Sequence, residues 1–566
     1  GVTGVQTCAL PICGAVHSNS KAKLISVSTN YTGNKALHGN GGAVYVTTRA
    51  TLSSTSDTMA YNEVSTVEGN GGALFVEEGG AVRTDTTIIK YHAVSRYGGS
   101  IYLKSGANMT MSDSMLFESS AVRGGALYVE GTNTSVLLES STFHHNNASL
   151  DGGLVHVSDG ASVSVYQSTL RRHTASRFGG SIYMESGSSV NCSESGISYS
   201  SARDGGVFYL SNATTVLEVS NSNITNNVAA HSGGGVYIAS GSTLEGRNTL
   251  YSDNIARFDC SSGGNGGGGA MYMEDETVVS SSMDRYWNNR ASQGNGGGLY
   301  VSGESAWSCS SCVLQNNTAY YHGGGIYTAS WKVDLVDGSV IRDNIAQTGD
   351  GGGFYSASQK NLSISGITFD SNHAMEQRGG GVALEYPVDV MMNNLILQMN
   401  EAVYGGGLYI PPGSTRVIMN NTVVDSNIAD ISGGGIYNNA SWVFRVYDSV
   451  FRENDALMKD GGGVYIETSS AIGVSDQQQR VVLSNLTFER NTATAGAGGA
   501  LYRSGNGSSI GVHDSLVSQN KAKTGGGFYL VNGSSSLTNT NFTSNYATTT
   551  GGAVVLSGSE MMSSSW

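Results

Sequence analysis

A glycine phrase recurs along the chain at near-constant spacing, and this repeat constrains the fold more than any other feature. "GGGIYN" begins at Gly433 and "GGGVYI" follows 28 residues later at Gly461. If the tyrosine of the phrase is taken as a marker, it or its replacement occurs 19 times, and 16 of the 18 spacings fall between 26 and 30 residues. The markers stand at 45, 75, 102, 128, 156, 183, 209, 237, 272, 300, 327, 355, 383, 409, 437, 465, 502, 529 and 555. Such fixed-period similarity predicts a repeat architecture in which each unit contacts its neighbours.

Each repeat contains three short segments with strand-like alternation. Examples are "GGGVYI" at 461–466, "STLEG" at 242–246 and "ITFDSNHA" at 367–374. Apolar residues stand two apart on either side of the marker, as Val464 and Ile466 do, so they share one face of a strand and the marker lies on the other. No window has a sustained helical stripe with caps.

A single repeat cannot fold alone, because its few buried apolar groups contribute roughly 6–12 kcal/mol while backbone ordering costs about 1–2 kcal/mol per residue. If each repeat coils into three strands and stacks on the next, every strand gains parallel partners and the apolar columns merge. The sequence therefore predicts an all-β, single-stranded, right-handed parallel β-helix of about 19 turns.

The third strand carries an asparagine at the same place in most turns. Stacked asparagines can donate to one neighbouring turn and accept from the other, so a structural amide ladder is predicted. Its members are Asn227, Asn254, Asn289, Asn317, Asn344, Asn372, Asn400, Asn427, Asn454 and Asn491.

The repeat also sets the expected domain boundaries. We expect one continuous β-helix over 31–556, with insertions near 258–266 and 467–485, where the two longest marker spacings fall. Residues 14–30 are expected to form an N-terminal lead-in, and 557–566 a truncated tail. The opening "GVTGVQTCALPIC", residues 1–13, breaks the repeat and is interpreted as adapter-derived sequence or as disordered.

Composition limits the classes of partner that the chain is expected to bind. Charged residues make up 13% of the chain and the formal net charge is −14, which argues against nucleic acid. No stretch approaches 18 consecutive apolar residues, so no membrane-spanning segment is expected within this chain. Nothing in the sequence calls for a cofactor or a metal.

The cysteines and the asparagine sequons indicate which cellular compartments are compatible with the chain. "CSSC" at Cys309 and Cys312 lacks the further ligands that a zinc site needs, so a local disulfide or free thiols are the alternatives. Fifteen asparagines lie in Asn-x-Ser/Thr sequons, among them Asn108, Asn361 and Asn532. They permit a glycosylated extracellular protein.

Two alternating signatures resemble those of the polymorphic outer-membrane proteins of chlamydiae. "GGAL" begins at Gly71 and Gly124, and "FDSN", "FREN", "FERN" and "FTSN" begin at Phe369, Phe451, Phe488 and Phe542. The resemblance covers about residues 31–556 and implies a pectin-lyase-like β-helix. In that family the repeats form a surface-displayed passenger that acts in adhesion, followed by a membrane β-barrel, so we expect a larger parent protein. The location is expected to be extracellular or the cell surface: a bacterial outer membrane, or, in a eukaryote, secreted or anchored at the plasma membrane.

The marker column offers a candidate binding surface. Fifteen of the 19 markers are tyrosine, and stacked on an outward face they would form an exposed stripe for sugar rings or a ladder that stabilises the strands. The candidate binding stripe consists of Tyr183, Tyr209, Tyr237, Tyr272, Tyr300, Tyr327, Tyr355, Tyr409, Tyr437 and Tyr465.

Pectin-lyase-like folds also include enzymes that cleave acidic polysaccharides with clustered aspartates. The aspartates here stand in mostly distant turns, and His144, His145, His173 and His322 have no triad-like companions. The aspartates considered are Asp151, Asp204, Asp253, Asp343, Asp350, Asp425 and Asp460. The predicted function is therefore non-enzymatic adhesion or display with glycans or cell-surface proteins as partners; the alternative is a polysaccharide lyase or glycoside hydrolase.

Overall fold

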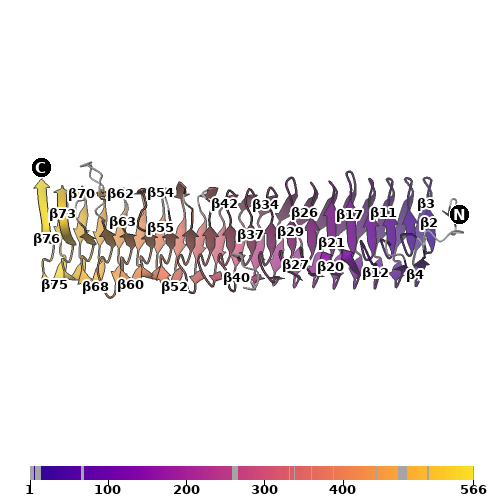
Figure 1. The fold of residues 1–566 in the computed structure, drawn as a ribbon, viewed down its shortest axis with the longest axis horizontal. Coiled ribbons are helices and arrows are strands. Elements are labelled where there is room, and N and C mark those ends of the chain that lie inside the picture. The colour runs from indigo at the N-terminus through magenta and orange to yellow at the C-terminus, as the bar shows by residue number, and fades with distance from the viewer. Residues whose placement is uncertain are drawn as a thin grey trace. The chain divides into compact units, whose positions relative to one another are not determined.

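The computed structural model divides into two compact units, Gly1–Arg285 and Tyr286–Trp566. It describes residues 5–6, 14–37, 39–65, 69–257, 266–330, 332–336, 338–358, 360–386, 388–439, 443–468, 481–505 and 509–564. Within each unit, short parallel strands repeat turn after turn, as the successive arrows of Figure 1 show. No described residue is helical, and none of the described segments is a helix long and apolar enough to cross a membrane.

A turn of the first unit contains four strands. Corresponding strands of successive turns pair in parallel, so that Tyr183 lies beside Tyr209 of β29 (Phe208–Leu210). One such turn consists of β25 (Ile182–Met184), β26 (Ser189–Ser193), β27 (Gly196–Ser198) and β28 (Ser201–Ala202). We refer to them as the first, second, third and fourth strands of a turn.

The second unit repeats the same plan. Leu408 and Tyr409 pair in parallel with Ile436 and Tyr437 of β61 (Ile436–Asn439). Its representative turn consists of β57 (Leu408–Ile410), β58 (Arg416–Asn420), β59 (Val423–Asp425) and β60 (Ile428–Ser432). The predicted all-β parallel β-helix of about 19 turns is thus confirmed.

The number of strands per turn differs from the three expected. The segment 367–374, predicted as one strand, forms β51 (Thr368–Asp370) and β52 (His373–Arg378). Ser371 lies between them with φ = 55°, a left-handed conformation that cannot continue a strand. Alternation of apolar residues gave no sign of this break, which separates the third strand from a fourth.

The interior of each turn is apolar because alternate residues of every strand point inward. In β59 only Val424 points into the core, where it is fully buried, and Phe451 fills the same place one turn later. Phe369, Phe444 and Phe488 are likewise fully buried. These side chains form the continuous core that a single repeat lacks.

A basic side chain also lies in the interior. Arg503 of β69 (Leu501–Ser504) is fully buried in register with Ile466 and Leu530, and its Nη1 donates to the Asn532 carbonyl. Burial lowers the pKa of the guanidinium. Because an apolar residue of similar volume removes the desolvation cost, we expect Arg503→Leu to raise the free energy of unfolding by about 1–4 kcal/mol. Denaturant titration measures this, and a loss of stability would show that the buried charge stabilises the fold.

The coil extends beyond both boundaries expected from the sequence. β2 (Val16–Ser18) already pairs in parallel with β6 (Val44–Val46), so part of the predicted lead-in forms a turn. At the other end, β76 (Val554–Ser564) pairs with β73 (Phe528–Thr538) through Ser564, within the predicted tail. His17 stands where tyrosine marks later turns, and the tail lacks the third-strand phrase, so pattern matching missed both. Most of each predicted insertion, and most of residues 1–13, lie outside the described residues.

Candidate functional site

The asparagines of the predicted ladder lie at one buried corner in successive turns. Asn427 shows the geometry: its Nδ2 donates to the Leu397 carbonyl at 2.8 Å and to Asn454 Oδ1 at 2.9 Å. Its Oδ1 accepts from the backbone N–H and the Nδ2 of Asn400. Every hydrogen-bonding group of the amide is therefore used inside the coil.

The ladder runs without a break through the second unit. The same pair of bonds links each member to the next, from Asn289 through Asn317, Asn344, Asn372, Asn400, Asn427, Asn454 and Asn491 to Asn520 and Asn545. In the first unit, Asn227 bonds Asn254 in the same way. These residues hold the turns together and leave no amide for a ligand.

Two histidines replace asparagine at this corner in the first unit. His92 Nε2 lies 3.2 Å from Asn62 Nδ2, and His173 Nδ1 accepts from the Asn146 backbone N–H at 3.3 Å. Both rings are buried, and burial lowers the pKa of each to about 3. His173, expected at a surface or a corner, is a corner residue.

These histidines predict acid sensitivity. In the unfolded chain they titrate near pH 6.5, so between about pH 6.5 and 3 the unfolded state binds more protons than the folded state. The free energy of unfolding should fall as pH drops through this range, by up to about 1.4 kcal/mol per pH unit for each histidine. Replacing both by the asparagine that the corner carries elsewhere should reduce this slope in urea titrations; equal slopes in the two proteins would show that the histidines are not buried neutral.

The marker tyrosines stack on one another outside the core. Ring centroids lie 4.8 Å apart between Tyr209 and Tyr237, and 4.6 Å apart between Tyr437 and Tyr465. The stripe is not exposed as predicted, because Tyr183, Tyr300, Tyr355 and Tyr409 keep only 4–6% of their surface and Tyr237 keeps 8%. Tyr209, Tyr272, Tyr327, Tyr437 and Tyr465 are half-buried.

In several turns the residue before the first glycine of the phrase lies against a marker ring. Phe178 stacks on Tyr209 at 4.3 Å, His322 on Tyr355 at 4.4 Å, and the Arg378 guanidinium lies 5.0 Å from the Tyr409 ring. The ends of these turns thus fold over the rings. Chain spacing could not reveal this cover, since the covering residue varies in type, and the close ring contacts favour the stabilising interpretation of the tyrosines over sugar stacking.

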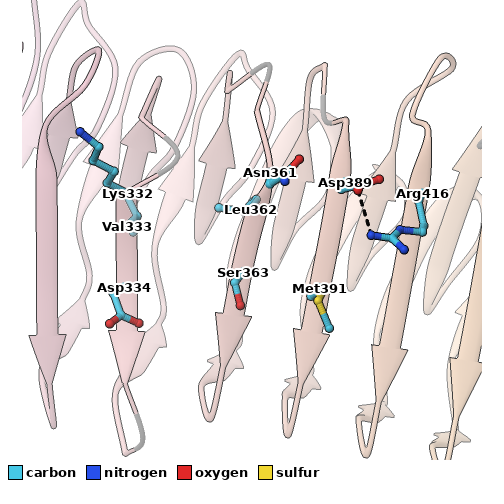
Figure 2. A pocket seen from close by; sticks show the side chains of 9 residues that line it. All are labelled: Lys332, Val333, Asp334, Asn361, Leu362, Ser363, Asp389, Met391 and Arg416. Carbon is cyan, nitrogen blue, oxygen red and sulfur yellow. Dashed lines mark hydrogen bonds and ion pairs between the residues drawn. The ribbon is translucent and has the colours of Figure 1, made fainter.

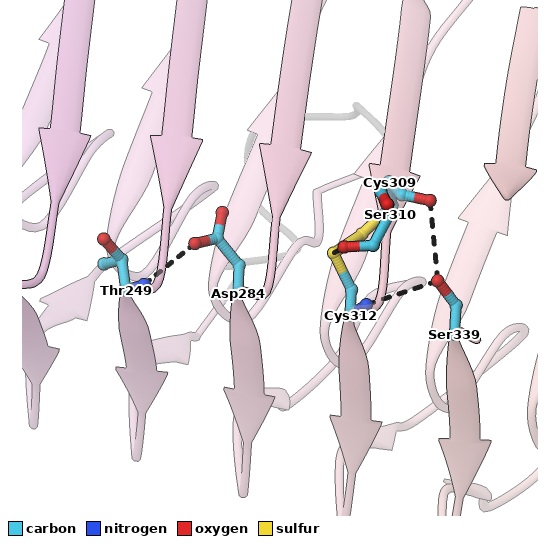
Figure 3. Close-up of a disulfide and its surroundings, with 6 residues drawn as sticks. All are labelled: Thr249, Asp284, Cys309, Ser310, Cys312 and Ser339. Atoms are coloured by element: carbon cyan, nitrogen blue, oxygen red, sulfur yellow. Dashed lines mark hydrogen bonds between the residues drawn. A yellow bond between two sulfur atoms is a disulfide. The ribbon is translucent and has the colours of Figure 1, made fainter. Parts of the chain in front are cut away.

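A second polar column, missed by sequence reasoning, lies between the second and third strands. In the first unit the backbone N–H of each serine donates to the hydroxyl of the next, as from Ser114 to Ser141 at 3.0 Å and from Ser141 to Ser168 at 3.1 Å. Asp284 takes this place later and accepts from Thr249 N–H at 2.8 Å (Figure 3). Burial raises the pKa of Asp284 to about 7. The serines that recur at this place in the sequence could have indicated the column.

The disulfide proposed as one alternative is present. Cys309 and Cys312 are bonded, with their Cα atoms 6.0 Å apart (Figure 3). Cys312 occupies the serine place of its turn, and its N–H donates to Ser339 Oγ at 3.2 Å. Cys192 is a free buried thiol, while Cys260 lies outside the described residues.

The acidic residues considered for catalysis are tied to separate partners. Asp151 accepts from Arg177 Nε at 2.8 Å, and Asp204 lies 2.9 Å from Arg203. Asp343 accepts from Gln315, and Asp425 from Arg452. Burial raises the pKa of Asp350 and of Asp460, which accept backbone N–H groups from Arg378 and Ala497. Within the described residues no three His, Cys, Asp or Glu side chains gather as metal ligands.

A hollow of about 430 Å³ opens on the outer face of the second strands in the second unit (Figure 2). It spans β46 (Lys332–Val336), β50 (Leu362–Ser365), β54 (Asp389–Asn393) and β58. Within the described residues, β46 is the last strand of its sheet, and β50 pairs only with β54. The lining residues are Lys332, Val333, Asp334, Asn361, Leu362, Ser363, Asp389, Met391 and Arg416.

The lining combines an apolar floor with a charged rim. Val333 and Leu362 are buried beneath it, Met391 is exposed, and Asp389 pairs with Arg416 at 2.9 Å. An apolar floor under a few polar groups suits an amphipathic group such as a sugar ring. No sequence pattern indicates this hollow, because it depends on an interrupted strand pairing.

Two comparisons with known protein families match this architecture. A family model described as a right handed beta helix region matches residues 72–255 and 380–547, together more than half of the chain. A Chlamydia polymorphic membrane protein repeat matches residues 311–329. No curated protein matches the chain. With its parallel turns and internal ladders, the chain belongs to the right-handed β-helix family.

Proposed function

We propose that this chain is a non-enzymatic β-helical scaffold of the cell surface or extracellular space. It acts in adhesion or display, and its partners are glycans or cell-surface proteins. The polar residues that recur in most turns, the asparagines above all, form hydrogen bonds between turns, while outward residues vary. A constant frame with a variable face is the arrangement by which repeat proteins bind partners.

Further observations support this proposal. The outward residues of neighbouring second strands change from Ser363 to Met391, Ile418 and Arg445 at one position. The match to a polymorphic membrane protein repeat fits a surface scaffold in general terms. The hollow beside Leu362 offers a contact point for a small group.

Binding and cleavage assays separate this function from its alternative. The purified chain is incubated with polyuronides and neutral glycans, and with cells carrying a native surface coat. We expect retention on some of these ligands without new reducing ends or unsaturated products; thermally unfolded chain is the control. Cleavage would assign the chain to the polysaccharide lyases or glycoside hydrolases, and absence of binding to every glycan and cell surface would contradict adhesion.

A further inference from the structure

The corner between the third and fourth strands carries aromatic and basic residues in part of the first unit. In each turn one residue there adopts a left-handed φ. Asn226 and Asp253 are types that this conformation favours, whereas Met399 and Arg490 in the second unit are not. Tyr61, Tyr91, His145, Arg172 and Tyr199 occupy it here, with φ between 54° and 59°. Bulky side chains are costly at such a φ.

Several of these bulky residues leave their side chains exposed. The Tyr61 side chain is 59% exposed and that of Tyr199 is 52% exposed, so neither contributes much apolar burial. His145 and Arg172 are exposed as well. These side chains are therefore accessible to a partner at the surface.

The rings at this corner form a continuous run across neighbouring turns. Tyr61 stacks on Tyr91 with centroids 4.8 Å apart and planes 12° apart, and Tyr91 meets Phe117 edge-on at 5.7 Å. Phe117, the last residue of β15 (Met115–Phe117), stacks on His144 at 4.5 Å. The run therefore reaches from one turn to the next on the outer surface of the third strands.

Cations accompany the rings. Lys90 Nζ lies 5.4 Å from the centroid of Tyr91 and 5.8 Å from that of Phe117. The Arg171 guanidinium lies 5.7 Å from the Tyr199 ring. Lys90, Arg171 and Arg172 bring three positive charges to these turns, where Glu118 carries a negative one, although the chain as a whole has a net charge of −14. The local charge is thus opposite to that of the molecule.

We propose that this surface, the corner strip formed by Tyr61, Lys90, Tyr91, Phe117, His144, His145, Arg171, Arg172 and Tyr199, binds a linear acidic polysaccharide. The proposal rests on the proposed adhesive function and names its ligand class. Aromatic faces pack against the C–H faces of sugar rings, while the guanidinium groups and the ammonium bind carboxylate or sulfate groups. Successive turns rise by about 4.8 Å, a step similar to that between sugar rings in an extended chain.

The test compares two polysaccharides with the same backbone. Affinity electrophoresis measures binding to dextran sulfate and to uncharged dextran of matched length. The aromatic variant carries Tyr61→Asn, Tyr91→Asn and Tyr199→Asn, which suit the left-handed φ and so preserve the fold. The cation variant carries Arg171→Gln and Arg172→Gln. The control variant carries Met399→Asn and Arg490→Gln, at the same corner in the second unit, where φ is 52° and 55°.

We expect dextran sulfate to bind at least tenfold more tightly than dextran, and added salt to weaken this binding. Each strip variant should lose at least tenfold in affinity, while the control variant binds like the unmodified chain. Unchanged binding by the aromatic variant, equal loss in the control variant, or equal retention of polyglutamate would overturn the proposal. If the strip variants adhere to cells as well as the unmodified chain does, the proposal for the corner strip is wrong and the adhesive function is retained. Cleavage of a glycan would instead contradict the adhesive function.

Discussion

Replacing Asn400 with alanine is expected to lower the free energy of unfolding by about 3–5 kcal/mol, a large share of the stability of a folded unit. Asn400 donates to the Phe369 carbonyl at 3.0 Å and to Asn427 Oδ1 at 2.9 Å, and it accepts two bonds from Asn372. The substitution leaves several buried polar groups unsatisfied at once. Denaturant titration and amide hydrogen exchange of the flanking turns measure the effect.

The matched control is Asn420→Ala in β58. Asn420 lies in the adjoining turn and makes one side-chain amide bond, to Asn393 Oδ1 at 2.8 Å in a partly exposed setting. We expect a loss of about 0.5–1 kcal/mol. Equal losses for the two substitutions would show that the ladder does not support the coil.

The second large effect is expected from Gly180→Ala. A Cβ at Gly180 would lie 2.2 Å from the Gly206 carbonyl oxygen and 2.8 Å from backbone atoms of Ser201. Backbone cannot move aside there without breaking strand pairing, so we expect a loss above about 3 kcal/mol. Thermal and denaturant unfolding of the purified variant report it.

Gly196→Ala provides the comparison, with the same change in the same turn. Gly196 lies in β27, has no heavy atom within 4 Å of an added Cβ, and is not among the glycines with positive φ. Its replacement should change stability by no more than about 0.5 kcal/mol or raise it slightly, because alanine restricts the unfolded chain. Equal stability of the two variants would show that the turns do not approach each other closely at Gly180.

The sequence revealed the features that depend on the period alone. Ala374 and Ala402 pair across adjacent turns, as do Phe369 and Leu397, because residues one period apart must meet when turns stack. The asparagine ladder follows from the same reasoning, since an amide can both donate to and accept from its copy in the next turn. These predictions needed no knowledge of how the turns bend.

Features that depend on the path between strands could not be read in this way. The cover of Tyr409 by Arg378 requires the turn end to fold back over the ring, and no period encodes that path. The break at Ser371 results from a backbone angle that many residue types can adopt at a cost. The hollow beside Leu362 exists because one strand pairing is interrupted, which alternation of apolar residues does not reveal.

Cross-linking of matching outward positions tests the stacking of turns most directly. Glu218 and Glu245 are register partners in β30 (Val216–Ser220) and β34 (Thr243–Arg247), whereas Ser280 of β38 (Val278–Ser282) lies one further turn away. Parallel neighbours about 4.8 Å apart suit a disulfide, and positions two turns apart exceed its reach of about 7 Å. We predict that Glu218→Cys with Glu245→Cys cross-links under mild oxidation and that Glu218→Cys with Ser280→Cys does not. Cross-linking of the distant pair alone, or of neither pair, would contradict the stacked coil.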